Sequence, residues 1–151
     1  MNSLSVIRAS AGSGKSHYLT GFYLKILMKE PVGYFKQILA VTFTNKATGE
    51  MKHRIIRELS RLAKGDNSTH LDFLISYTGK SEAFIREKSA RILENILHDF
   101  SWFSIETIDS FFLRIIRGFT HELGIPGNYA IEIEINPIIQ HAVDALIDHV
   151  Q

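Results

Sequence analysis

Apolar residues along the chain form short β-favouring runs that alternate with longer stripes at helical spacing. The run at 4–8 predicts a buried strand, and the near-continuous run at 37–43 (QILAVTF) predicts a central strand. Apolar positions recur every three or four residues from Leu19 until Pro31, and again through residues 46–64, so a helix is predicted after each strand. This order of strand, helix, strand and helix favours an α/β fold with a parallel sheet flanked by helices.

The middle and later parts of the chain predict further helices and one short strand. Residues 71–77 form a short apolar patch that indicates a helical piece. Apolar spacing between residues 81 and 100 predicts a long amphipathic helix, with Ser81 as its N-terminal cap. A short strand is predicted at 103–106, and helical spacing then resumes over 107–123.

The C-terminal stretch begins with alternating apolar and acidic residues. Residues 131–135 (IEIEI) predict a strand with one buried face, and Pro137 opens a last helix. We therefore predict one α/β domain over residues 1–136 and the start of a helical accessory subdomain over residues 137–151. No internal repeat, low-complexity tract or long linker divides the chain.

The composition is that of one ordinary globular domain: 45% of the 151 residues are hydrophobic and 22% are charged. The absence of cysteine excludes disulfides, thiolate metal sites and a cysteine nucleophile, and the seven histidines have no zinc-binding spacing. No apolar run is long enough to span a bilayer, and the first residues do not form a secretory signal. The sequence therefore predicts a cytoplasmic protein that does not associate with a membrane.

Charge is distributed unevenly along the chain. Residues 1–117 hold all 17 Lys and Arg, whereas residues 118–151 hold five acidic residues and no Lys or Arg. This asymmetry favours contact between the first part and a polyanion, although mixed surface charge can also partition in this way by chance.

The residues after the first predicted strand spell a phosphate-binding loop. They are Ala9, Ser10, Ala11, Gly12, Ser13, Gly14, Lys15 and Ser16. The pattern is that of a P-loop, except that Ala9 stands in place of the first glycine. Gly12 and Gly14 would let backbone N–H groups surround a phosphate at the start of a helix. The alternative interpretation is a Gly/Ser-rich turn that matches the pattern by chance.

Two side chains of this loop carry the predicted chemistry. Lys15 would contact the β- and γ-phosphates of ATP and is the predicted catalytic residue. The Ser16 hydroxyl would supply one ligand to a nucleotide-bound Mg²⁺. We therefore expect ATP and Mg²⁺ as cofactors, and no other metal. A P-loop alone is compatible with a kinase, a GTPase or a motor protein.

Two further segments resemble conserved motifs of superfamily 1 DNA helicases. Residues 41–55 (VTFTNKATGEMKHRI) resemble motif Ia of UvrD-, AddA- and RecB-like helicases, and residues 107–112 (TIDSFF) resemble the next conserved stretch, TIHSF. The loop spelling ASAGSGKS is more similar to the RecB/AddA branch than to the UvrD/Rep branch. The resemblance covers residues 4–125 and implies a RecA-like P-loop NTPase fold. The chain would then be an incomplete N-terminal portion of helicase domain 1A.

The resemblance implies an ATP-dependent DNA helicase or translocase, moving 3′ to 5′ in DNA repair or recombination. Single-stranded and duplex DNA would be its substrates, and a helicase–nuclease partner subunit is compatible with it. The residues it implies as DNA contacts are Phe43, Thr44, Asn45, Lys46, Thr107 and Ser110. Two other functions stay open at this point: a P-loop nucleotide or small-molecule kinase, and a P-loop domain that binds without turnover.

The residues themselves leave alternatives for several of these contacts. Phe43 could stack on a base or fill the core at the end of a strand. Thr107 and Ser110 could bind phosphate or cap the helix that follows. We expect the aromatic residues Trp102, Phe111 and Phe112 to lie in the core. The helix at 46–64 has six Lys and Arg against two Glu, which is by default a solvated face.

Three features depart from the helicase pattern. Asp109 stands where the family generally has His. Gly49 stands where a helix former is usual, so either the helix begins late or the backbone at Gly49 needs close approach by another group. No acidic pair follows an apolar strand, and Asp99 is the nearest candidate. ATP hydrolysis by such motors needs that pair and arginines from a second lobe. We therefore expect this chain alone to bind ATP weakly and to hydrolyse it at a negligible rate.

Overall fold

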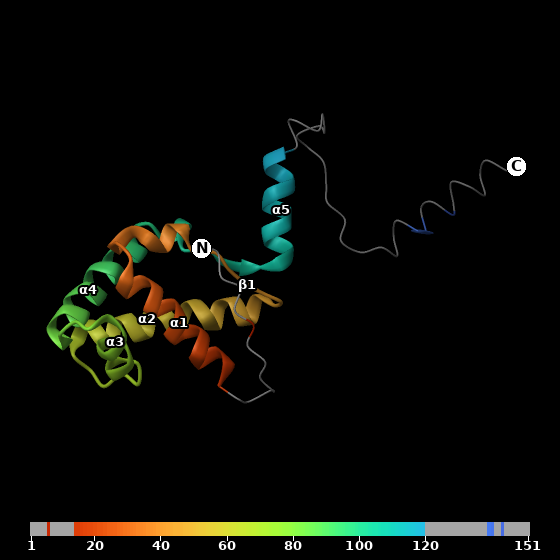
Figure 1. Cartoon of the computed structure of the whole chain (residues 1–151). Coiled ribbons are helices and arrows are strands. Elements are labelled where there is room, and N and C mark those ends of the chain that lie inside the picture. The colour runs from red at the N-terminus through yellow and green to blue at the C-terminus, as the bar shows by residue number, and fades with distance from the viewer. Residues whose placement is uncertain (1–5, 7–13, 120–138, 141–142, 144–151) are drawn as a thin grey trace, which may run out of the picture. The chain divides into compact units, whose positions relative to one another are not determined.

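The computed structural model is divided into two units, residues 1–112 and 113–151, which are described separately (Figure 1). Its described residues are 6, 14–119, 139, 140 and 143. The predicted strand at 131–135 and the loop residues 9–13 lie outside the described residues, and only residue 6 of the predicted strand at 4–8 is described. Within the described part of the chain, no helix is both long and apolar enough to cross a bilayer.

Helices make up most of the described structure, and the sheet is small. The elements are α1 (Lys15–Lys29), η1 (Val32–Gln37), β1 (Ala40–Thr42), α2 (Asn45–Lys64), α3 (Leu71–Thr78), α4 (Glu82–His98), η2 (Phe100–Trp102), β2 (Ile105–Thr107) and α5 (Ile108–Phe119). The helices predicted before Pro31, over 46–64 and over 71–77 are confirmed. Helix α5 is confirmed as far as Phe119, beyond which the predicted helix is not described.

Local capping explains where the longer helices begin. The Ser81 hydroxyl accepts a hydrogen bond from the Phe84 backbone N–H at 3.3 Å, which confirms the predicted cap of α4. Helix α4 ends at His98, two residues before the predicted end, because the chain then tightens into the short helix η2. The Thr44 hydroxyl caps α2 by accepting a hydrogen bond from the Ala47 N–H.

The two described strands pair in parallel, which confirms the predicted parallel relationship. Ala40 pairs with Ile105, and Thr42 pairs with Thr107. Strand β1 is shorter than the predicted run at 37–43, because Gln37 still belongs to η1 and the strand pairing starts only at Ala40. Strand β2 starts two residues later than predicted, since the backbone around Phe103 makes local turn bonds instead.

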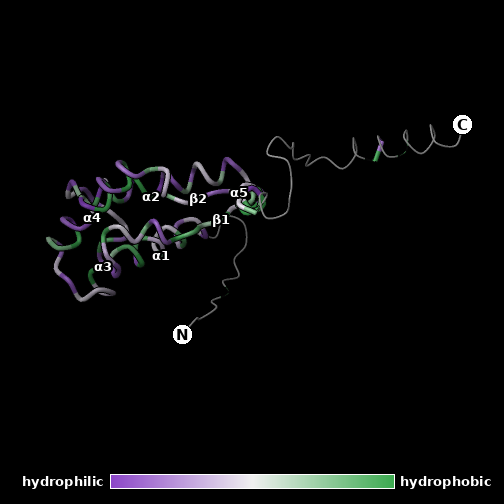
Figure 2. Tube along the Cα trace, turned by 90° about the horizontal axis from the view of Figure 1, so that it is seen from above, coloured by the Kyte–Doolittle hydropathy of each residue, from purple (hydrophilic) through white to green (hydrophobic). Residues whose placement is uncertain are grey.

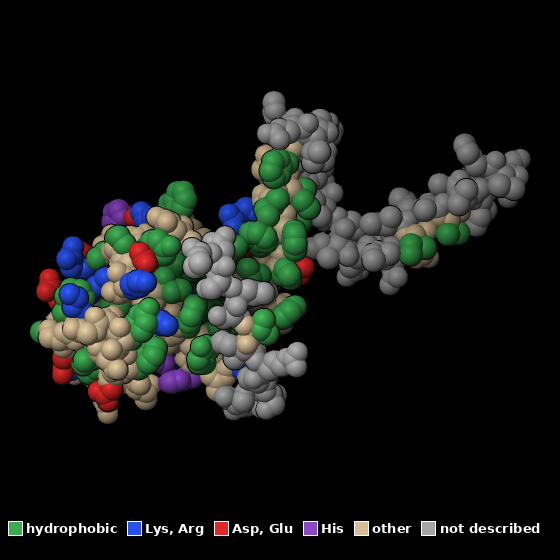
Figure 3. All heavy atoms as spheres, in the orientation of Figure 1, with side chains coloured by type: hydrophobic (Ala, Val, Ile, Leu, Met, Phe, Trp, Pro, Cys, Tyr) green, Lys and Arg blue, Asp and Glu red, His purple; other side chains and the backbone are tan. Residues whose placement is uncertain are grey.

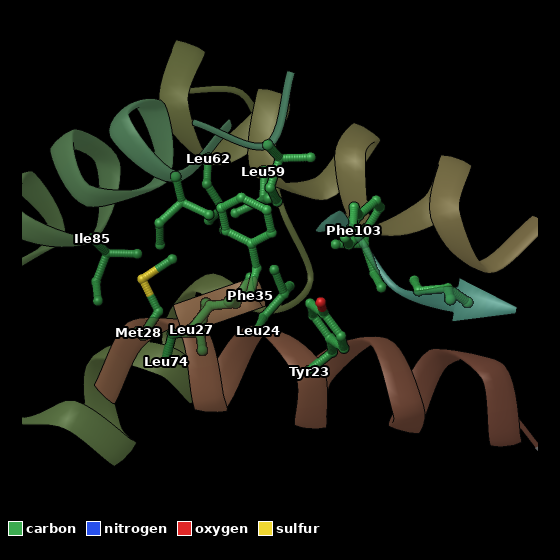
Figure 4. Close-up of a cluster of buried hydrophobic side chains, with 14 residues drawn as sticks. Tyr23, Leu24, Leu27, Met28, Phe35, Leu59, Leu62, Leu74, Ile85 and Phe103 are labelled. Atoms are coloured by element: carbon green, nitrogen blue, oxygen red, sulfur yellow. The ribbon is translucent and has the colours of Figure 1, made fainter. Parts of the chain in front are cut away.

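The helices of the first unit form two layers, with α1 beside α3 in one and α2 beside α4 in the other (Figure 2). The core lies between these layers, and its labelled side chains converge from α1, η1, α2, α3 and α4 and from Phe103, just after η2 (Figure 4). The buried apolar residues are Tyr23, Leu24, Leu27, Met28, Phe35, Ile55, Leu59, Leu62, Leu74, Ile85, Ile92, Ile96, Phe103 and Ile105. The core is thus built mainly from the helical stripes that the sequence predicts.

Two aromatic residues expected in the core are exposed instead. Trp102 is 59% exposed and Phe112 is 54% exposed, whereas Phe111 is half-buried. Trp102 ends the short helix η2, which turns its ring outward, and the next residue, Phe103, takes the core position with 1% exposure. Phe112 lies on α5, a helix with no buried residue among the described ones.

Candidate nucleotide and nucleic-acid site

Helix α1 begins in a way that suits an anion. Gly14, its N-cap, has φ 79°, a left-handed conformation that glycine adopts without strain. No described side chain caps this end, and the first turn contains no acidic residue. The first-turn N–H groups and the positive end of the helix dipole therefore face outward beside the exposed residues Lys15 and Ser16.

The connection between β1 and α2 is held by threonine side chains. Thr42 donates a hydrogen bond to the Thr44 carbonyl at 3.1 Å, and its hydroxyl is 2.7 Å from the Thr48 hydroxyl. Since Thr44 also caps α2, residues 42–48 form a closed hydrogen-bonded unit. The Thr44 hydroxyl accepts a bond from the Ala47 N–H and keeps its own proton for another acceptor.

Phe43 projects from this unit and is 87% exposed. The core interpretation of Phe43 is therefore wrong. Phe43 lies one residue beyond the end of β1, so the strand pairing does not hold its ring against the core. An aromatic ring exposed at the carboxyl end of a parallel strand can offer a flat apolar face to a nucleic-acid base.

The first turn of α2 is polar and basic. Asn45 and Lys46 are exposed, and no acidic residue lies in that turn. Helix α2 begins at Asn45, so the expectation that the helix starts late to avoid Gly49 is wrong. Gly49 lies in the helix interior, and a Cβ atom there would meet no described atom within 4 Å.

These features meet at one cavity of about 420 Å³. Its walls come from the first turns of α1, the end of β1 and the first turns of α2. The lining residues are Lys15, Ser16, Leu19, Thr20, Val41, Thr42, Phe43, Ala47, Glu50, Met51 and Arg54. The sequence predicted the phosphate-loop residues and the β1–α2 residues separately, and the structure places them around the same space.

Thr107 and Ser110 lie at the neighbouring strand end but are not among the lining residues of the cavity. The Thr107 hydroxyl donates to the Ser110 hydroxyl at 2.9 Å and accepts from the Ser110 N–H at 3.2 Å. Thr107 is buried, so capping is what its side chain does in this structure. Ser110 is exposed, and its own hydroxyl proton is not used in that pair. Asp109, beside it, is exposed in the first turn of α5.

Asp99, the nearest acidic candidate for a metal site, has a structural role. Its carboxylate accepts hydrogen bonds from Lys36 and, at 2.8 Å, from His98. The bond from Lys36 is the main reason that the pKa of Asp99 is lowered. Asp99 does not line the cavity, and the described residues contain no cluster of His, Asp or Glu that could hold a metal ion.

Three residues in or beside the cavity matter for its chemistry but were not predicted as site residues. Arg54 brings a second positive charge to the cavity wall, Glu50 brings a carboxylate, and Thr48 fixes the β1–α2 connection behind it. The four-residue spacing of Glu50 and Arg54 places them on one side of α2, and this signal was available in the sequence. Lys52, in contrast, lies over the Phe100 ring at 5.3 Å and contributes to packing.

Known proteins with similar sequences include ATP-dependent helicase/nuclease proteins and a RecB protein. The chain is 33% identical over 129 residues to an ATP-dependent helicase/nuclease protein of Bacillus mycoides (strain KBAB4), covering 83% of this chain and 8% of that protein. It is 34% identical to the protein of the same name from Anoxybacillus flavithermus (strain DSM 21510 / WK1), covering 86% of this chain and 9% of that protein. The RecB protein of the RecBCD enzyme of Haemophilus influenzae (strain ATCC 51907 / DSM 11121 / KW20 / Rd) is 28% identical, covering 85% of this chain and 12% of that protein.

The chain therefore spans between 8% and 12% of the length of these relatives. No solved structure matches it significantly. The model of the UvrD/REP helicase N-terminal domain matches residues 1–150, nearly the whole sequence. This chain belongs to the UvrD/REP helicase N-terminal domain family.

Proposed function

We propose that this chain is the ATP-binding part of an ATP-dependent DNA helicase or translocase. One observation carries the proposal: Lys15 at the start of α1 and the exposed ring of Phe43 line the same cavity. A phosphate held at one wall and a base stacked at another would share α1, β1 and α2 as common supports. In such an arrangement, the state of the bound nucleotide would influence the affinity for a nucleic-acid strand.

The nucleotide would be held by the loop residues Ala9 to Ser16. The start of α1 fits a triphosphate, since it combines a left-handed glycine, no described side-chain cap and no acidic residue. Lys15 would contact the β- and γ-phosphates, and the Ser16 hydroxyl would ligate Mg²⁺. The metal would neutralise charge on the transferring phosphoryl group.

Single-stranded DNA would contact the ends of β1 and β2. Phe43 would stack on a base, which contributes about 1–3 kcal/mol per base without sequence preference. The α2 start, with Thr44, Asn45 and Lys46, would hold backbone phosphates through N–H groups and side chains. The free hydroxyl proton of Ser110 would add a phosphate contact, while Thr107 would position Ser110.

In the whole protein, the activity would be ATP hydrolysis coupled to 3′ to 5′ movement on DNA, in cytoplasmic repair or recombination. A nuclease domain or partner subunit would fit the helicase/nuclease names of the relatives. The only carboxylate among the described lining residues of the cavity is Glu50. We therefore expect this chain alone to bind ATP weakly without appreciable turnover.

Binding of a fluorescent ATP analogue with Mg²⁺ tests the nucleotide site. Lys15→Ala should weaken binding at least tenfold, whereas Lys64→Ala, at the far end of α2, should not change it. Equal affinities for the wild-type chain and Lys15→Ala would contradict the nucleotide assignment. ATP hydrolysis by this chain above the Lys15→Ala background would contradict its expected inactivity.

Fluorescence anisotropy with a labelled oligothymidylate tests the DNA site. Phe43→Ala should weaken binding about five- to hundredfold, because one stacked base is lost, and Phe43→Trp should preserve it. Trp102→Ala is the matched control, since Trp102 is an exposed aromatic residue outside the cavity. An unchanged affinity for Phe43→Ala would refute stacking at this position.

A further inference from the structure

Helix α1 has a second face that the proposed ATP and DNA site does not use. Residues 15, 16, 19 and 20 line the cavity described above, whereas residues 17, 18, 21 and 22 line a separate hollow of about 380 Å³ between α1 and α3. Another hollow, of about 360 Å³, lies where α1 and α3 meet the start of α4. We call the surface that carries both hollows the α1–α3 face.

Exposed aromatic rings are the first notable feature of the α1–α3 face. Phe22, Phe73, Tyr77 and Phe84 are each between 37% and 46% exposed. Phe73 and Tyr77 lie one helical turn apart on α3. Their rings are nearly parallel, with an interplanar angle of 17° and centroids 6.2 Å apart. Rings held in this way present large apolar surfaces to solvent without filling the core.

Lysine side chains lie between these rings. The Lys25 ammonium is 4.2 Å from the centroid of the Tyr77 ring and 5.7 Å from that of Phe22. The Lys80 ammonium is 5.8 Å from the Phe84 centroid. Neither lysine forms a salt bridge with a described residue. The same is true of Lys29, which also lines the second hollow.

Lys88 fixes a positive charge at the base of the second hollow. Its ammonium donates hydrogen bonds to the Met28 and Glu30 carbonyls, both at 2.8 Å, at the end of α1. These carbonyls are neutral, and the carboxylate that acts on Lys88, that of Glu30, is not among the lining residues of the hollow. No Asp or Glu side chain is among the described residues that line the two hollows. The lining of both hollows is therefore basic and aromatic. Over the face of the molecule that Figure 3 shows, basic, acidic and apolar side chains are interspersed.

We propose that the α1–α3 face is a second binding site for single-stranded nucleic acid. Bases would stack on Phe73 and Tyr77, and the backbone phosphates would contact Lys25, Lys29 and Lys80. Aromatic platforms combined with a basic groove are the usual means of binding single strands without sequence preference. A duplex keeps its bases stacked inside the helix and cannot use the rings in this way.

The lysines decide between a nucleic acid and a protein partner. The buried centre of a protein–protein interface is depleted in charged residues, and lysine is depleted at interfaces in general. Here the lysines lie among the rings and not around an apolar centre, and the described lining residues offer them no carboxylate. A phosphate backbone would satisfy these charges and, by drawing Lys25 off the Tyr77 ring, would leave that ring for a base.

The α1–α3 face can be tested separately from the proposed DNA site at Phe43. A background variant carrying Phe43→Ala and Asn45→Ala removes the proposed base and phosphate contacts there. Anisotropy with an oligothymidylate of about 16 nucleotides should still show binding in this background, with the remaining affinity depending on the α1–α3 face.

Two sets of substitutions in that background report on stacking and charge. Phe73→Leu with Tyr77→Leu keeps apolar volume but removes the rings, and should weaken binding about five- to hundredfold. Lys25→Gln with Lys80→Gln should lower the slope of log affinity against log salt concentration by about 0.7 for each phosphate that is no longer neutralised. Lys64→Gln is the matched control and should change neither quantity. Circular dichroism melting checks that each variant remains folded.

Three results would overturn the proposal. The first is an oligothymidylate affinity and salt slope that the folded face variants leave unchanged. The second is duplex binding as tight as single-strand binding in the background variant. The third is unchanged DNA binding together with self-association that Phe73→Leu and Tyr77→Leu abolish, which would assign the face to protein contact. None of these results bears on DNA binding at Phe43. The proposed function is therefore tested separately from the α1–α3 face.

Discussion

Thr42 of β1 and Thr107 of β2 are register partners at the carboxyl ends of two parallel strands. Residues predicted to contact DNA lie just beyond both: Phe43 follows Thr42 at once, and Ser110 lies in the first turn of α5, three residues after Thr107. The pairing therefore brings two segments separated by about sixty residues of sequence to one edge of the sheet, where ligands bind in open α/β folds.

The hydrogen bond between Thr42 and Thr48 should couple the strand end to α2. Thr42→Val and Thr48→Val each remove one of two hydroxyls that are 2.7 Å apart. In a double-mutant cycle, the two substitutions should be non-additive by about 1 kcal/mol in the free energy of unfolding, measured by urea denaturation. The pair Thr42→Val and Thr78→Val is the control, because Thr78 bonds the Leu74 carbonyl on a different helix. Additive effects in the Thr42–Thr48 cycle would show that this bond contributes no coupling.

Replacing Gly49 should stabilise α2. Gly49→Ala should raise the free energy of unfolding by about 1 kcal/mol, since alanine favours a helix interior and the added Cβ meets no described atom. Thermal or urea denaturation measures the change. Gly14→Ala is the contrasting substitution and should be destabilising, because Gly14 has a positive φ. If Gly49→Ala is instead neutral or destabilising, the helix does not have free space there.

The Tyr23 hydroxyl is buried without a hydrogen-bond partner among the described residues, while its ring packs edge-on to Phe103 at 5.9 Å. Burial raises the pKa of Tyr23 because the phenolate would be desolvated. Tyr23→Phe should therefore increase the free energy of unfolding by about 1 kcal/mol, as it removes an unsatisfied polar group and keeps the ring. Tyr34→Phe, on η1, is the control. A loss of stability in Tyr23→Phe would mean that the hydroxyl has a partner.

His70 should make the stability of the chain sensitive to pH. It is buried and stacks on His17 with ring centroids 4.2 Å apart. Burial is the main reason that the pKa of His70 is lowered from 6.5; the nearby His17 lowers it further, and Glu58 opposes the shift. The folded state therefore binds the proton more weakly than the unfolded state. The contribution of His70 to folding stability is fully present above pH 6.5. It is lost as the pH falls through 6.5 towards the lower pKa of His70 in the folded state.

Urea denaturation at several pH values between about 7.5 and 5 measures this effect. His70→Gln should flatten the curve in this window. His53→Gln, which changes an exposed histidine on α2, should leave the curve as in the wild-type chain. A wild-type curve that is flat, or that rises as the pH falls, would contradict the sign predicted for His70.

Regular helices were predicted well because their determinants are local. The cap at Ser81 and the buried stripe of Ile55, Leu59 and Leu62 follow from residue type and spacing alone. Strand ends were predicted less well, since nothing in the near-continuous β-favouring run at 37–43 marks the residue at which strand pairing begins. What shortens β1 there is the pairing with β2, a partner far away in sequence.

The site could be predicted in its parts but not as a whole. Sequence motifs singled out Lys15 and Phe43 separately, whereas the meeting of their segments around one cavity follows only from the positions of α1 and β1. The exposure of Trp102 was missed because hydrophobicity gives no direction to a ring at the end of a turn. The α1–α3 face was missed for a similar reason: α3 is too short for its spacing to show which side meets solvent.

The hydrogen-bonded unit at residues 42–48 holds the backbone on both sides of Phe43. The strand end is tied to the first turn of α2 on both sides of the ring, so the backbone beneath it cannot stretch or fold independently. Any displacement of β1 relative to a bound strand would therefore carry the ring by the same distance and not be absorbed in a loop. Under the proposed function, such an attachment would transmit small movements of the sheet to a bound DNA strand.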